Sequence, residues 1–105
     1  MLRKQNRLQR ADFVSLEKGR RAASEHFSCT QKDAESFRVA VIVSKKVAKN
    51  ASERHLLKRR VLSVIEEHTP SHGLYSVYAR KNSTLLPFSK IKEEIRALLR
   101  LPTSV

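Results

Sequence analysis

Apolar residues alternate or cluster in three stretches whose pattern predicts β-strands. FRVAVIVS (37–44) is β-branched and almost continuously apolar, as is typical of a strand buried in the middle of a sheet. GLYSVYAR (73–80) alternates two sets of side chains and predicts a second strand. RAASEHFSCTQ (21–31) is ambiguous and predicts one or two short strands with Phe27 inward. The polar segment 32–36 has the composition of a turn.

Three other stretches have helical spacing. Residues 50–68 form the clearest helix, with Asn50 as its N-cap and Glu53 three residues later in a capping-box arrangement. A short helix is expected from Leu8 to Gly19, where glycine suits a left-handed C-terminal residue, and a last helix is expected over 88–100 after Pro87. The positions expected to face the sheet are Leu57, Val61, Val64, Ile65, Ile91, Ile95, Leu98 and Leu99. Strand, helix, strand with helices at both ends predicts an α/β sandwich.

Composition adds a strong positive charge to this picture. The 105 residues include 22 Lys and Arg against 10 acids, a net charge of +12, which favours a polyanionic partner: nucleic acid first and an anionic membrane second. The longest apolar run has five residues, far below the roughly 20 that span a bilayer. Cys29 is alone, which fits a cytoplasmic setting. Residues 1–105 therefore predict one nucleic-acid-binding domain, with residues 1–7 as a flexible basic arm.

Candidate catalytic chemistry is sparse. Two glycines cannot build a phosphate-binding glycine loop, and one cysteine cannot complete a structural zinc site. His68 and His72 flank a proline and are interpreted as ordinary loop residues. The pairs Glu66–Glu67 and Glu93–Glu94 are interpreted as solvated faces, because adjacent helical residues diverge.

The densest positive charge follows the apolar strand, in SKKVAKNASERHLLKRR (44–60). A charge run is often only a solvated face. Here Lys45 and Lys46 leave a buried strand, and the cations of the following helix lie opposite its apolar side, so the segment is suited to contact phosphates. Arg80 and Lys81 would reach the same sheet edge if the two strands are parallel.

This segment resembles the signature of the bacterial ribonuclease P protein subunit, in which a strand ending in Ser-Lys-Lys-Val precedes a helix bearing Arg-Asn-Arg-x-Lys-Arg. Arg54, Lys58 and Arg59 match that motif, whereas His55 and Leu56 stand in place of its Asn and second Arg. NRLQRADF (6–13), YAR-K (78–81), the last helix and the total length also resemble the family in the same order.

The resemblance implies the ribonuclease P protein-like fold: a two-layer α+β sandwich, α-β-β-β-α-β-α, with a mixed sheet and a left-handed β-α-β crossover. It implies a ribonucleoprotein endoribonuclease that matures the 5′ end of tRNA. In this enzyme the RNA is catalytic and holds Mg²⁺, and the protein itself binds no cofactor. The implied partners are ribonuclease P RNA and precursor tRNA, without membrane or DNA. The implied RNA-binding residues are Arg54, His55, Lys58, Arg59 and Arg60. The implied contacts to the 5′ leader are Phe13, Lys45, Lys46, Arg80 and Lys81.

Two alternatives remain open. A basic ribosome-associated protein of similar fold would have no effect on tRNA processing. A stand-alone nuclease using His55 or His26 would cleave without added RNA, although no paired acid and base is evident in the sequence.

Overall fold

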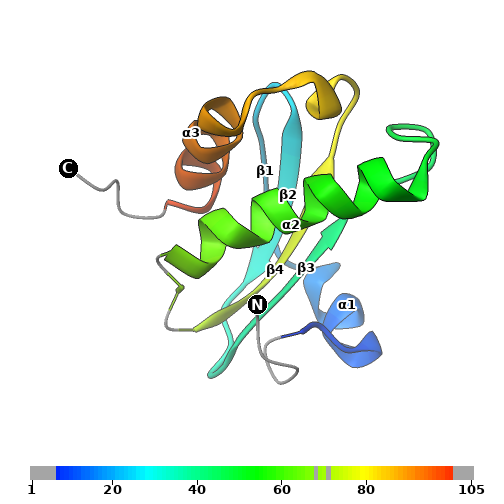
Figure 1. The fold of residues 1–105 in the computed structure, drawn as a ribbon. Helices are drawn as coiled ribbons and strands as arrows, with labels where there is room; N and C mark the ends of the chain where they lie inside the picture. The colour runs from blue at the N-terminus through cyan, green and yellow to red at the C-terminus, as the bar shows by residue number, and fades with distance from the viewer. Residues whose placement is uncertain (1–6, 68, 71, 101–105) are drawn as a thin grey trace.

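A computed structural model describes residues 7–67, 69–70 and 72–100, which form one four-stranded sheet with helices on both of its faces (Figure 1). The elements in chain order are α1 (Arg10–Leu16), β1 (Arg20–Ala23), β2 (Phe27–Lys32), β3 (Phe37–Ile42), α2 (Ala51–Glu67), β4 (Gly73–Ala79), the 3₁₀ turn η2 (Ser83–Leu85) and α3 (Phe88–Leu99). The ambiguous segment 21–31 therefore forms two strands, and Phe27 is fully buried as predicted.

The strands lie in the order β1-β2-β4-β3, with β3 parallel to β4 and the other pairs antiparallel. From β3 the chain crosses over through α2, in front of the sheet in Figure 1, and returns as β4 on the left of β3. This connection is left-handed, as the family resemblance implied. The prediction that 37–44 lies in the middle of the sheet is wrong, because β3 is an edge strand and β4 is interior. A continuous run of apolar residues indicates that a strand is buried, but it does not show how many strands lie beside it.

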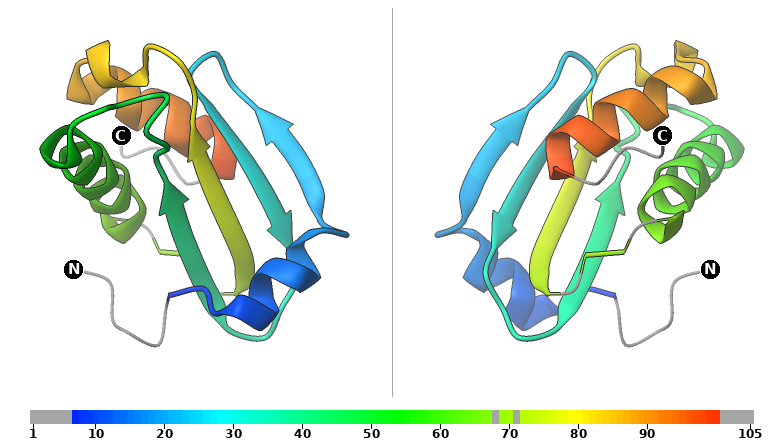
Figure 2. Two further views of the ribbon diagram at one scale, coloured as in Figure 1. Left: turned by 90° about the vertical axis from the view of Figure 1, so that its right-hand side faces the viewer. Right: turned by 90° about the vertical axis from the view of Figure 1, so that its left-hand side faces the viewer.

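The hydrophobic core lies between the sheet and two helices. Phe37, Val39 and Val41 alternate with less buried residues along β3 and point into this layer. The predicted inward faces of α2 and α3 are confirmed: Leu57, Val61, Val64, Ile65, Ile91, Ile95, Leu98 and Leu99 are all buried. Figure 2 shows α1 on the opposite face, near the end where β3 and β4 begin, so that it covers only part of that face.

The first helix is shorter than predicted. It spans Arg10–Leu16, and a turn leads on to Gly19. Gly19 does not have a positive φ, so the predicted left-handed stop is wrong. Glycine is needed there because a Cβ atom would lie 2.4 Å from the carbonyl oxygen of Gln31. The Asp12 carboxylate accepts hydrogen bonds from the Gln9 backbone N–H at 2.8 Å and from Arg38 Nη1 at 3.1 Å, which fastens α1 to the sheet.

The start of the described chain lies along the outer edge of β3. Arg7 forms a parallel bridge with Val39, and the Leu8 N–H donates to the Val39 carbonyl oxygen at 3.3 Å. The rest of the predicted basic arm, residues 1–6, lies outside the described residues.

The interpretation of both glutamate pairs as solvated faces is wrong for Glu94, whose side chain is only 17% exposed, whereas Glu67 is exposed and also forms ion pairs. Glu94 Oε1 accepts hydrogen bonds from Ser24 Oγ at 2.7 Å and from the His26 N–H at 2.9 Å, while its Oε2 lies 2.7 Å from His26 Nδ1. Glu67 on α2 pairs with Lys92 and Arg96 on α3. These carboxylates tie α3 to the β1–β2 turn and to α2, contacts that helical spacing alone cannot predict.

Candidate nucleic-acid interface

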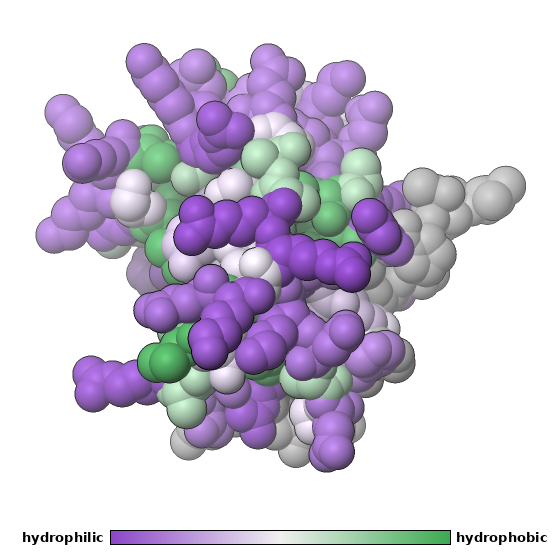
Figure 3. All heavy atoms as spheres, turned by 180° about the vertical axis from the view of Figure 1, so that it is seen from behind, coloured by the Kyte–Doolittle hydropathy of each residue, from purple (hydrophilic) through white to green (hydrophobic). Residues whose placement is uncertain are grey.

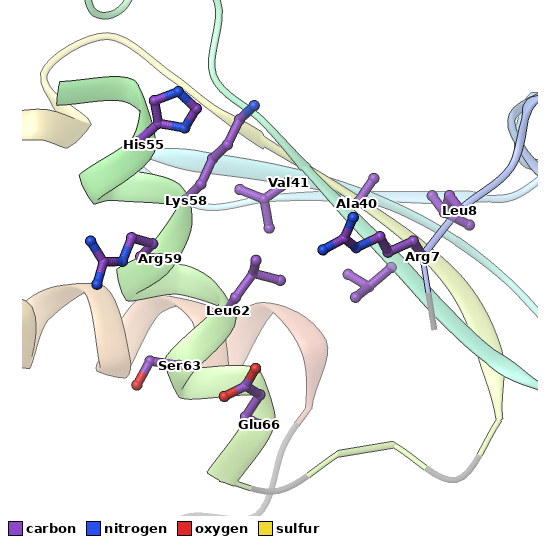
Figure 4. Close-up of a pocket in the computed structure, with 11 residues that line it drawn as sticks. Arg7, Leu8, Ala40, Val41, His55, Lys58, Arg59, Leu62, Ser63 and Glu66 are labelled. Atoms are coloured by element: carbon purple, nitrogen blue, oxygen red, sulfur yellow. The ribbon is translucent and has the colours of Figure 1, made fainter. Parts of the chain in front are cut away.

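A groove of about 710 Å³ runs between α2 and the outer edge of β3 (Figure 4). His55, Lys58 and Arg59 line it from α2, with Lys58 pointing towards β3, and Arg7 lies on the opposite side. Its other lining residues are Leu8, Val39, Ala40, Val41, Leu62, Ser63 and Glu66. Among the described residues no hydrogen bond or ion pair holds the cationic ends of Lys58 and Arg59. The groove therefore offers unpaired positive charge beside an apolar floor.

Arg54 and Arg60 do not belong to this groove. Arg54 Nη1 donates to the carbonyl oxygens of Ala48 and Lys49 at 2.9 and 2.8 Å, so its guanidinium holds the connector between β3 and α2. Arg60 lines the other side of α2, facing η2. The five residues assigned to RNA binding from the sequence thus fall into three places on one helix.

The four cations predicted to contact the 5′ leader lie at the same end of the sheet, where β3 and β4 finish. Because β3 and β4 are parallel and Ile42 is opposite Tyr78, Lys45 and Lys81 each lie three residues beyond that pair, at the same end of the sheet. Lys45, Lys46 and Lys81 are exposed. Arg80 is exposed as well, and its Nη1 donates to the Ser24 carbonyl at 3.0 Å, which fixes the end of β4 to the β1–β2 turn.

Phe13 lies apart from those cations, on α1, and is 37% exposed. The part of the sheet that α1 leaves open contains Tyr78, 39% exposed, in a shallow depression with Ser28 and Thr30. Figure 3 shows this side of the molecule, where hydrophilic side chains surround small pale and green areas. Sequence reasoning missed Tyr78 as a site residue. The alternation in 73–80 separates it from Val77, but that pattern does not tell which face stays uncovered.

Ser24, His26 and Glu94 form a polar cluster in the described part of the chain, and Cys29 is a buried thiol. Ser24 and His26 both bond the carboxylate of Glu94 instead of each other, so His26 is not placed to activate the Ser24 hydroxyl. Burial raises the pKa of the Cys29 thiol to about 12, which makes it a poor nucleophile. In the described part of the chain, no three His, Cys, Asp or Glu side chains come together as metal ligands. Within the same residues, no helix combines the length and apolarity needed to cross a membrane.

Comparisons with known proteins show the family and the fold of the chain. The model of the family described as Ribonuclease P matches residues 2–102. The structure of the Staphylococcus aureus RNase P protein is similar with a TM-score of 0.81 and 24% identity, covering 90% of this chain and 93% of that one. The Thermotoga maritima RNase P protein has a TM-score of 0.77 and 23% identity, over 92% and 98% of the two chains. No curated protein sequence matches the chain. Fold and family match together show that the chain belongs to the ribonuclease P protein family.

Proposed function

We propose that this chain is the protein cofactor of a cytoplasmic ribonuclease P, in which the RNA partner carries the active site and its Mg²⁺. The protein binds that RNA with the groove side of α2 and binds the 5′ leader of precursor tRNA elsewhere on the sheet. The observation that carries the proposal is the set of cations on α2, chiefly Lys58 and Arg59, that have no partner among the described residues. Such side chains gain from neutralising phosphates, because each contact releases condensed counterions.

The second half of the proposal concerns the leader. Lys45, Lys46, Arg80 and Lys81 place positive charge at one end of the sheet, and two aromatic rings are partly exposed, Phe13 on α1 and Tyr78 on the uncovered part of the sheet. Single-stranded RNA is bound by this combination of a charged track and stacking rings. Only the precursor has unpaired leader bases, so these residues would favour substrate over mature tRNA.

Reconstitution tests the proposal. The protein is added to a bacterial ribonuclease P RNA and a precursor tRNA, and cleavage at the mature 5′ end is followed at low and high Mg²⁺. Stimulation is expected mainly at low Mg²⁺, where neutralisation of phosphate repulsion by the protein matters most. Cleavage by the protein without RNA would favour the stand-alone nuclease, and no effect on cleavage would favour the ribosome-associated alternative.

Stacking on the leader has its own test. Phe13→Ala and Tyr78→Ala should each weaken binding of precursor tRNA by about 1–3 kcal/mol, the usual contribution of one base–aromatic stack. Binding of mature tRNA is the matched control and should change little. Equal weakening for both RNAs would exclude a role in leader recognition.

A further inference from the structure

A second, smaller pocket lies on the side of α2 away from the groove. It has a volume of about 270 Å³ and is lined by Glu53, Leu56, Leu57 and Arg60 of α2 and by Thr84 and Leu85 of η2. The four α2 residues have the spacing i, i+3, i+4, i+7, so they form one stripe along the helix. We call this the α2–η2 pocket. An acidic group therefore lies at one end of an apolar floor, and a cationic group lies at the other.

The apolar walls of the α2–η2 pocket are unusually open to solvent. Leu85 is 78% exposed and Leu56 is 47% exposed, two of the most exposed large apolar side chains in the described residues. Leu85 is the last residue of the short 3₁₀ turn η2, which begins at the buried Ser83, and its N–H donates to the Asn82 carbonyl oxygen at 3.1 Å. Two leucines held apart over a small depression favour a flat apolar group between them.

The polar ends of the pocket are available to a ligand. Among the described residues, no hydrogen bond or ion pair holds the Arg60 guanidinium. Within the same described residues, the Glu53 carboxylate accepts a single long hydrogen bond, of 3.4 Å, from the Asn50 amide. Seven residues at 1.5 Å per residue separate Glu53 from Arg60 by about 10 Å along the axis. That span is comparable to a nucleotide measured from the pairing edge of its base to its phosphate.

We propose that the α2–η2 pocket binds one unpaired nucleotide of an RNA, with a base that carries an exocyclic amino group. The base lies between Leu56 and Leu85, its amino group donates to Glu53, and Arg60 contacts the phosphate. Carboxylates accept from the amino groups of bases, and unstacked bases in RNA are read at their pairing edges. The inference rests on the proposed RNA-binding function and adds a base-specific contact to it.

Methyl resonances give the direct test. The protein, labelled at leucine and valine methyl groups, is titrated with short single-stranded oligo-rC. Ring currents from a docked base should shift the methyl signals of Leu56 and Leu85. Leu98 on α3, which lines neither the groove nor the α2–η2 pocket, is the control and should not shift. Unchanged Leu56 and Leu85 signals under conditions where the oligonucleotide is bound would overturn the proposal.

Base preference tests the role of Glu53. Uracil has no exocyclic amino group, so oligo-rC should bind about two- to tenfold more tightly than oligo-rU, the range that one net hydrogen bond provides. Glu53→Gln should lower this ratio, because a neutral amide can also donate to the O4 of uracil, and the loss of one negative charge should raise both affinities. Leu85→Ser should lower the affinity for oligo-rC, whereas Ala97→Ser, at an exposed position on α3, should not. An unchanged ratio in Glu53→Gln would overturn the assignment of the amino contact.

The outcomes separate this inference from the function on which it rests. If no oligonucleotide binds and ribonuclease P RNA is not bound either, the proposed function fails. If RNA binds with normal salt dependence while the pocket shows neither methyl shifts nor base preference, only the pocket assignment fails. Self-association that sedimentation detects and Leu85→Ser abolishes would show that the two leucines cover a second copy of the chain, and would also overturn the proposal.

Discussion

Arg54 and Lys58 lie about one turn apart on α2 but have different surroundings. The Arg54 guanidinium donates to two carbonyl oxygens of the connector, and Lys58 has no partner among the described residues. The sequence placed both in one basic motif, because a motif records residue type and spacing. It cannot show that the connector lies near the start of the helix, where its carbonyl oxygens accept hydrogen bonds from Arg54.

Arg54→Ala should therefore lower the free energy of unfolding by about 1 kcal/mol, since two carbonyl oxygens lose a charged donor at a partly exposed site. Urea denaturation measures this change. Arg54→Lys is the matched control for charge and should retain only part of the stability, because an ammonium group lacks the planar fork of a guanidinium. No loss in either variant would show that the two bonds do not fix the connector.

Lys58→Ala should leave the free energy of unfolding within about 0.5 kcal/mol of the parent, as is usual for exposed polar positions. Its effect should appear in RNA binding, where the slope of log affinity against log salt should fall by about 0.7–0.9 for one lost phosphate contact. Lys90→Ala on α3 is the control, because it removes the same charge at an exposed position outside the groove. Identical slopes for the two variants would mean that Lys58 acts only through net charge.

Glu94 makes stability depend on acid pH. Its burial would raise its pKa, but hydrogen bonds from Ser24 and His26 outweigh this effect and lower the pKa below the ordinary value of 4.5. When the pKa of a carboxyl group is lower in the folded than in the unfolded protein, the ionised group stabilises the fold. This contribution is fully present above the unfolded-state pKa and is lost as the pH falls through the folded-state pKa. Glu94→Gln should therefore flatten the fall in stability below about pH 4.5. Thermal melts across that range measure it, and a parallel curve would contradict the assignment.

At the scale of the element, α2 has three sides with different surroundings. One side is buried in the core, one lines the groove and one lines the α2–η2 pocket. Helical periodicity correctly predicted its buried stripe, since 100° per residue determines which residues share a face. It could not predict that Arg59 lines the groove while Arg60 lines the α2–η2 pocket. That division depends on where β3 and η2 lie against the helix, which is decided by the tertiary fold.

Leu57 tests the buried side of α2. It is 3% exposed within the core, so Leu57→Ala should cost about 2–5 kcal/mol of unfolding free energy, the range for buried leucine truncations. Leu56→Ala is the matched control on the neighbouring, exposed position and should cost far less. Chemical denaturation of the two variants compares them directly. Equal costs would mean that the helix is rotated relative to the sheet.

At the scale of the whole molecule, the sequence predicted the main elements and the shared edge of the parallel strands, but not the lateral order of the sheet. The alternation along β3 and β4 reports which side chains are buried. Backbone hydrogen bonds determine which strands are neighbours, and the alternation of apolar and polar residues does not depend on them. The same limit explains Gly19, whose role depends on the distant carbonyl of Gln31.

The net charge of +12 gives a prediction for the entire chain. Salt should raise the melting temperature of the free protein, because it screens repulsion among cations. The same salt should weaken RNA binding, because counterion release then gains less free energy. Melting and binding measured over one salt series should change in opposite directions. A melting temperature that falls with salt would show that attractive ion pairs, such as those of Glu67, dominate instead.

The edge position of β3 has a consequence for solubility. FRVAVIV is the most β-prone segment of the chain, and an uncovered edge strand of this kind is a template for intermolecular pairing and fibril growth. In the described structure, the Arg7–Leu8 bridge to Val39 occupies part of that edge, and Lys58 and Arg59 border the same groove. Like charges on two approaching copies oppose contact between their edges. The cations proposed to bind RNA should thus also oppose aggregation of the protein.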